Sequence, residues 1–164
     1  MRQAAIFLLL VAWAPVLAAQ ADAPRRRRFT LLTGVGNSLG WFGAQGERYF
    51  AGDRLSVFGG LGYTPDVDAN ASGITVAAGL RGFTAGGKHR AFVELGISQI
   101  AVQSGIDRRL YGPGLQAGWQ FVSRGGFTVM TSAGLGYIPA EDVSHPVQAL
   151  IGLGLGYTWR RPPP

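Results

Sequence analysis

The chain of 164 residues has a net charge of +6 and no cysteine, which excludes disulfides, thiol catalysis and thiolate metal sites. Only 15% of the residues are charged, below the roughly 25% of an average soluble domain, whereas glycine occurs 26 times. Glycine at this abundance disfavours helices, and it follows no collagen period.

The N-terminus has the features of an export signal. Arg2 supplies a positive start, and residues 4–14 form an apolar run too short to span a membrane as a helix. Small residues at 19–21 follow the break at Pro15. We therefore predict a signal peptide over residues 1–21, cleaved after Ala21; an uncleaved anchor is the alternative.

Two basic blocks flank the remaining sequence. Residues 22–28 form a basic N-terminal tail that contains Arg25 to Arg28, and residues 160–164 form a C-terminal tail that begins with Arg160 and Arg161. Such blocks are solvated tails or contacts to anionic lipid headgroups or the cell wall. Nucleic acid is not an expected partner of an exported chain without a basic face interleaved with aromatic residues.

Between the tails, segments of alternating hydrophobicity are separated by stretches rich in Gly, Pro, Asn, Asp and Ser, which is typical of strands and turns. The predicted strands are 29–36, 39–50, 54–64, 73–84, 91–104, 113–123, 127–138 and 147–159. Asn37-Ser38 is predicted to be a tight turn between the first two strands.

The last segment shows the strongest alternation. One set of alternate positions is mostly glycine and small polar residues, and the other set is entirely apolar and ends in two aromatics. The apolar set is Val147, Ala149, Ile151, Leu153, Leu155, Tyr157 and Trp159. A strand with these two faces suits lipid on one side and a crowded lumen on the other. The same alternation in the other segments predicts an all-β protein, an eight-stranded antiparallel up-and-down transmembrane β-barrel over residues 29–159.

The opposite face of the predicted strands carries polar and charged residues. Folding the fourth and fifth strands about Gly86-Gly87 places Arg81 opposite Glu94 on this inner face and Leu80 opposite Leu95 on the outer face. We predict a structural network in the lumen formed by Glu47, Arg54, Arg81 and Glu94. A gated polar pore is the other interpretation, but eight strands leave an interior that side chains just fill.

This architecture, together with the terminal Gly156-Tyr157-Thr158-Trp159, resembles the small eight-stranded outer-membrane barrels of the OmpA and OmpX type. The resemblance implies a Gram-negative outer membrane and a monomer in contact with outer-membrane lipid and lipopolysaccharide. It implies insertion by the barrel assembly machinery, with Tyr157 and Trp159 in the assembly signal. It also implies a non-catalytic role in envelope structure or surface contact. The residues themselves show no metal-ligand spacing and no phosphate loop, so we expect no cofactor or metal.

Two alternatives remain. Residues 36–40 fit the G-x-S-x-G spacing, so an outer-leaflet lipid hydrolase or acyltransferase could use Ser38 or Ser144 with His145, although a nucleophile elbow requires a helix after the serine. His89, the other histidine, is expected in a solvated turn. The second alternative is a secreted soluble barrel that binds an apolar ligand.

Overall fold

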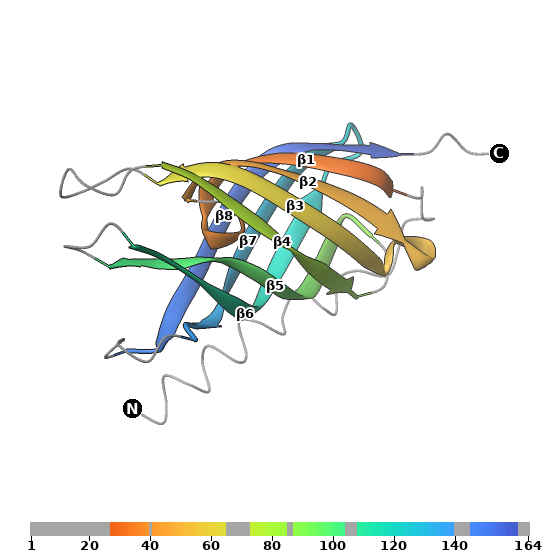
Figure 1. Cartoon of the computed structure of the whole chain (residues 1–164). Coiled ribbons are helices and arrows are strands. Elements are labelled where there is room, and N and C mark those ends of the chain that lie inside the picture. The colour runs from red at the N-terminus through yellow and green to blue at the C-terminus, as the bar shows by residue number, and fades with distance from the viewer. Residues whose placement is uncertain are drawn as a thin grey trace, which may run out of the picture.

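A computed structural model shows a closed barrel in which the sheet returns from its last strand to its first (Figure 1). The structure describes residues 27–39, 41–64, 73–84, 87–103, 108–139 and 145–160. The predicted signal peptide, residues 22–26 and residues 161–164 lie outside these ranges. The strands are β1 (Arg27–Gly36), β2 (Trp41–Phe50), β3 (Leu55–Thr64), β4 (Gly73–Phe83), β5 (His89–Gln103), β6 (Arg108–Val122), β7 (Phe127–Tyr137) and β8 (Val147–Arg160).

Each strand pairs antiparallel with the next, and β1 also pairs with β8, so the predicted eight-stranded up-and-down barrel is confirmed. The main difference is the hairpin of β5 and β6, whose ladder extends to the pair Gln103–Arg108. The sequence predicts a loop over residues 105–112, which are rich in glycine and charge, but residues 108–112 pair with β5. The pairing continues past an irregularity between Gln99 and Ala101.

His89 is a second correction. It is the first residue of β5 rather than a turn residue, and its ring stacks on Trp119 with centroids 5.4 Å apart. The β5–β6 pairing places it next to Phe121 as well.

The predicted register of the β4–β5 hairpin is confirmed. Arg81 pairs with Glu94 and Leu80 with Leu95. The two pairs point to opposite faces, because Arg81 and Glu94 are buried whereas Leu80 and Leu95 are about 60% exposed. The short connection between the strands determines this register, since few residues are available to shift it.

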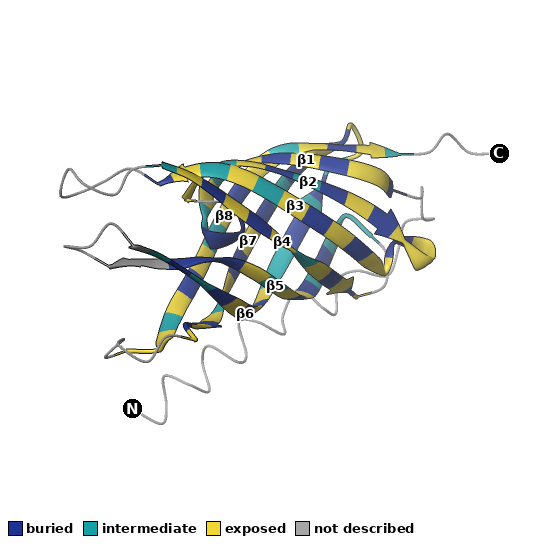
Figure 2. Ribbon diagram, in the orientation of Figure 1, coloured by how far each residue is buried: buried dark blue, intermediate teal, exposed yellow. Residues whose placement is uncertain are grey.

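Burial alternates along the strands around the barrel, as Figure 2 shows. Side chains of one parity are apolar and exposed, for example Ile151 at 69%. Side chains of the other parity fill the lumen, and many of them are polar, such as Glu47 at 0%. The lumen therefore contains both polar and apolar side chains, whereas the outer wall is largely apolar.

The two ends of the barrel differ. One end, called the turn end, contains the connections β2–β3, β4–β5 and β6–β7. The start of β1 and the end of β8 also lie there, where Arg27 and Arg160 are backbone partners in the β1–β8 ladder. The loop end contains the other four connections. In Figure 1 strand β8 ends at the turn end. In the described part of the chain, no helix is long and apolar enough to cross a membrane.

The predicted turn at Asn37-Ser38 is instead a short 3₁₀ helix, η2 (Asn37–Leu39), that folds into the lumen. All three of its residues are buried, and it contacts strands β1 to β5 and β8. Glycines on the wall provide the space. A Cβ on Gly60 would overlap the Ser38 carbonyl oxygen, and one on Gly43 would overlap that of Leu39.

Candidate functional site

The centre of the lumen is an ion-pair cluster around Arg81. Its Nε and Nη2 both lie 2.6 Å from Glu94 Oε2, and its Nη1 lies 3.3 Å from Glu47 Oε1. The contact with Glu47 is an ion pair without hydrogen-bond geometry. All three side chains are nearly inaccessible to solvent. Buried charges of this kind are tolerated when they are paired and hydrogen-bonded.

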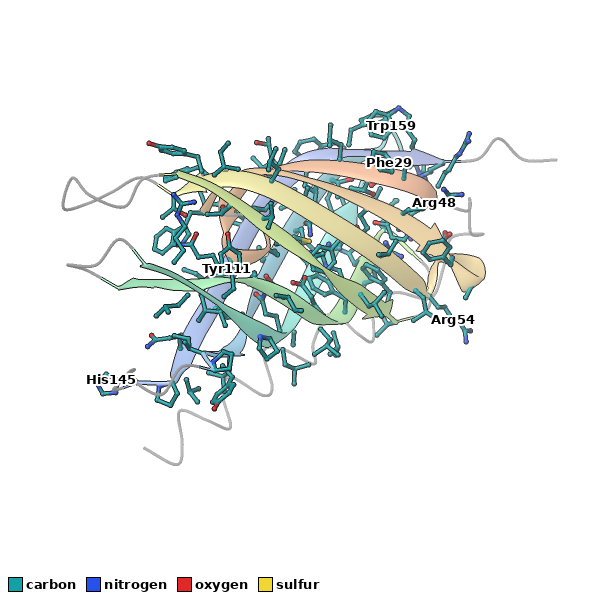
Figure 3. All side chains as sticks on the ribbon, in the orientation of Figure 1. Phe29, Arg48, Arg54, Tyr111, His145 and Trp159 are labelled. Atoms are coloured by element: carbon teal, nitrogen blue, oxygen red, sulfur yellow. The ribbon has the colours of Figure 1, made fainter. Side chains whose placement is uncertain are left out.

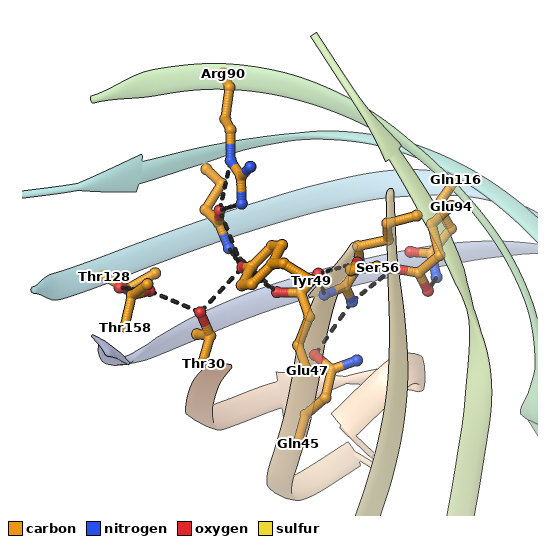
Figure 4. A network of polar contacts seen from close by, with 12 residues as sticks. Thr30, Gln45, Glu47, Tyr49, Ser56, Arg90, Glu94, Gln116, Thr128 and Thr158 are labelled. Atoms are coloured by element: carbon orange, nitrogen blue, oxygen red, sulfur yellow. Dashed lines mark hydrogen bonds and ion pairs between the residues drawn. The ribbon is translucent and has the colours of Figure 1, made fainter. Parts of the chain in front are cut away.

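Neutral polar side chains satisfy the two carboxylates (Figure 4). Ser56 Oγ and the Tyr49 hydroxyl each donate to Glu47 at 2.6 Å. Gln116 Nε2 donates to Glu94 Oε1 at 3.1 Å, and Ser132 Oγ donates to Gln116 at 3.0 Å. The cluster therefore links strands that are distant in the sequence.

A second cluster lies closer to the turn end. Arg90 donates from Nε and Nη2 to Gln120 Oε1 at 2.9 and 2.6 Å, and from Nη1 to the Asp53 carbonyl at 2.9 Å. Gln120 Nε2 lies 3.2 Å from the Tyr49 hydroxyl, which joins this cluster to Glu47. A chain of hydroxyls continues from Tyr49 through Thr30 and on to Thr158 and Thr128.

Aromatic rings fill the space around both guanidinium groups. The Arg81 guanidinium carbon lies 4.3 Å from the ring centre of Phe58, and that of Arg90 lies 3.6 Å from the ring centre of Phe83. Guanidinium groups stack well on aromatic faces when little water is present. The lumen is consequently packed with ion pairs and rings.

The structure brings together three of the four residues predicted for this network. Glu47, Arg81 and Glu94 meet, but Arg54 does not join them. Arg54 is exposed and has helical backbone angles, because the strand begins one residue later at Leu55. Arg54 is therefore not part of the strand, and the alternation that would place it on the inner face does not determine where its side chain points. Figure 3 shows Arg54 at the turn end, outside the lumen.

Tyr49 and Arg90 were missed, although both have inward parity. Tyr49 follows Gln45 and Glu47 on alternate positions of β2. Arg90 precedes Glu94 by four residues on β5, but it lies just before the predicted strand 91–104. Extending the alternation two residues backwards would have found Arg90.

The structure does not bring Ser38 and His145 of the enzyme alternative together. Ser38 is buried on η2, where it lies in a tightly packed part of the lumen that is also lined by Glu94, Ser98 and Gln116. Its Oγ has no hydrogen-bond partner within the described ranges. His145 is exposed at the loop end and points away from the barrel (Figure 3). Ser144 lies outside the described residues.

The η2 segment also lacks the geometry of a nucleophile elbow. It has three residues and is followed by strand β2, whereas the elbow requires a helix after the serine. Its contacts are structural: Asn37 Nδ2 donates to the Gln99 carbonyl at 3.0 Å, and Ile151 N donates to Asn37 Oδ1 at 3.4 Å. The ladder between β4 and β5 ends at the pair Ala78–Ile97, so Asn37 meets β5 beyond the end of that ladder.

Tyr157 and Trp159 lie on the outer wall of β8 near the turn end and are about 45% exposed. Trp159 packs against Tyr157 and against Phe29 of β1, with centroid distances of 4.9 and 5.7 Å. They belong to a set of exposed aromatic side chains near that end, which are Phe29, Phe50, Phe127, Tyr157 and Trp159. A corresponding set near the loop end comprises Trp41, Phe42, Tyr63 and Tyr137.

Among the described residues, no group of three or more His, Cys, Asp or Glu side chains is arranged to hold a metal ion. No protein-family model matches the chain, and it has no match among curated proteins or solved structures.

Proposed function

We propose that the protein is a monomeric outer-membrane β-barrel of a Gram-negative envelope, with a closed polar lumen and a non-catalytic role in envelope structure or surface contact. The observation that carries this proposal is the apolar outer wall. Each strand contributes exposed large hydrophobic side chains, among them Leu31, Leu61, Val76, Leu95, Leu115, Leu135 and Ile151. Exposed apolar area of this extent, continuous around a barrel, matches lipid rather than water.

The dimensions support a membrane span. β7 has 11 residues, which corresponds to about 33 Å along the strand and about 25 Å along the barrel axis at a tilt of about 40°. It begins at Phe127 and ends at Tyr137, one from each aromatic set. An apolar band about 25 Å tall between two aromatic girdles is the arrangement expected of outer-membrane barrels.

A closed lumen is supported by its contents. The Arg81 cluster fills the middle of the lumen, and the Arg90 cluster fills its part near the turn end. The η2 segment fills the lumen on the loop-end side of these clusters. An apolar cluster at the loop end adds Ile100, Leu110, Ile138 and Leu150. We therefore propose that the lumen stiffens the barrel and does not conduct. Planar-bilayer recording of the refolded protein should show no steady channel, and a stable conductance would contradict closure.

The exposed pair Tyr157 and Trp159 near the end of the last strand supports a role in recognition by the barrel assembly machinery. The apolar wall and its aromatic girdles support outer-membrane lipid and lipopolysaccharide as surroundings.

Membrane fractionation tests the main proposal. The protein should stay with the outer membrane after washing with high salt or carbonate and should be released only by detergent. A soluble barrel that binds an apolar ligand would appear instead in the soluble periplasmic fraction. Comparison of lipid A by mass spectrometry with and without the protein tests the hydrolase alternative, for which we expect no difference.

A further inference from the structure

The turn end of the barrel is surrounded by exposed or half-exposed basic side chains that come from separate parts of the chain. This basic belt consists of Arg28, Arg48, Arg54, Lys88, Arg124 and Arg160. The sequence shows only Arg28 and Arg160 as parts of basic blocks. The others are scattered singly along the chain. They gather because the connections β2–β3, β4–β5 and β6–β7 lie at the same end as the start of β1 and the end of β8.

Among the residues that the structure describes, acidic side chains do not offset this charge at the surface. Within the described ranges the acidic residues are Glu47, Asp53 and Glu94, and each is buried. Asp53 is the one at the turn end, and its carboxylate accepts a hydrogen bond from Arg27 N at 2.7 Å. The exposed surface of the turn end is therefore basic in the part of the chain that the structure describes.

Arg48 shows how the belt relates to the apolar wall. It lies on the outward face of β2, where it pairs with Phe29 on β1 and Val57 on β3. Phe29 packs against Trp159, and Figure 3 shows these three side chains close together at the turn end. An arginine in this position can lay its alkyl stem along the apolar wall and extend its guanidinium group beyond the aromatic girdle.

We propose that the basic belt binds the anionic headgroups of phospholipids in the leaflet that surrounds the turn end. This inference rests on the proposed membrane location. Guanidinium groups form paired, charge-assisted hydrogen bonds with phosphate, and a negatively charged headgroup layer attracts basic side chains within a Debye length. A belt adjoining an apolar wall matches a layer of headgroups, which can contact every side of the barrel at the same depth.

The experiment uses the full mature chain refolded into vesicles of phosphatidylcholine alone or of phosphatidylcholine and phosphatidylglycerol in equal amounts. Electron paramagnetic resonance measures how much spin-labelled phosphatidylglycerol and spin-labelled phosphatidylcholine is immobilised at the barrel. We expect a several-fold preference for phosphatidylglycerol, and high salt should reduce it because the attraction is electrostatic.

Single substitutions locate the site. Arg48→Gln should lower the preference, and combining it with Arg54→Gln and Arg124→Gln should abolish most of it. Arg109→Gln is the matched control, because it removes the same charge from β6 near the loop end. Resistance of the folded band to unboiled detergent electrophoresis and to protease verifies insertion of each variant.

The outcomes separate the two proposals. If the protein inserts but selects neither lipid, the inference about the belt is wrong and the membrane location stands. An equal loss in the Arg48→Gln and Arg109→Gln variants would also overturn the inference, as would a stronger selection of spin-labelled lipopolysaccharide than of phosphatidylglycerol. Failure of the unmodified chain to insert into either vesicle would overturn both proposals.

Discussion

Arg81 and Glu94 face each other across the β4–β5 hairpin inside the barrel, with two guanidinium nitrogens 2.6 Å from one carboxylate oxygen. Glu47 approaches the same guanidinium from β2. The three residues thus form one buried unit in which a single cation serves two carboxylates.

Because Arg81 is the shared cation, we expect substitution of Arg81 to lower the free energy of unfolding more than substitution of Glu94 does. Arg81→Met leaves two buried carboxylates without their cation and should cost about 3–5 kcal/mol of unfolding free energy. Glu94→Gln should cost less, since Arg81 keeps Glu47 as its partner. The double variant should cost less than the sum, as measured by equilibrium unfolding in detergent or lipid. Strictly additive costs would mean that the pair does not interact, and Arg54→Gln, an exposed control, should change stability by less than about 0.5 kcal/mol.

The proposed membrane span predicts that the cost of a charge on the outer wall depends on its depth. Leu153 lies on the outer face near the middle of β8, whereas Leu55 is the first residue of β3 at the turn end, and both are about half exposed. Leu153→Arg should destabilise the barrel in lipid vesicles by about 2–4 kcal/mol and Leu55→Arg by about 0–1 kcal/mol. Because the substitution is identical, equal costs would argue against a lipid-facing wall.

The packing of η2 predicts opposite effects for two neighbouring glycines. A Cβ on Gly60 would overlap the Ser38 carbonyl oxygen, whereas a Cβ on Gly59 would meet nothing within 4 Å. Gly60→Ala should therefore destabilise the barrel by about 1–3 kcal/mol, through overpacking of the lumen. Gly59→Ala should be neutral or slightly stabilising, because it reduces the entropy of the unfolded chain. Similar unfolding curves for both variants would show that η2 does not occupy the lumen.

Assembly should depend on Trp159. Trp159→Ala should lower the fraction of protein that reaches the folded, heat-modifiable form in cells, since this residue ends the aromatic row of β8. Removal of residues 162–164 should have little effect. Trp41→Ala is the matched control, because Trp41 is equally exposed but belongs to the aromatic set at the loop end. The assignment of the signal fails if the tail deletion or Trp41→Ala impairs assembly more than Trp159→Ala does.

The sequence alone was sufficient for the number of strands and for their two faces. Alternation of period two identifies both, because neighbouring side chains of a strand point to opposite sides regardless of what packs against them. It was also sufficient for the pairing of Arg81 with Glu94, since a short turn connects their strands and the apolar pair Leu80–Leu95 matches only in that register.

Only the tertiary structure decided the features that depend on several strands at once. The η2 segment has no periodicity, and its place in the lumen depends on Gly43 and Gly60 of the facing wall. Arg54 has the parity of the lumen but lies outside it, because the turn before β3 has helical backbone geometry. The basic belt exists only because closure of the barrel brings residues as distant as Arg48, Arg124 and Arg160 to one end.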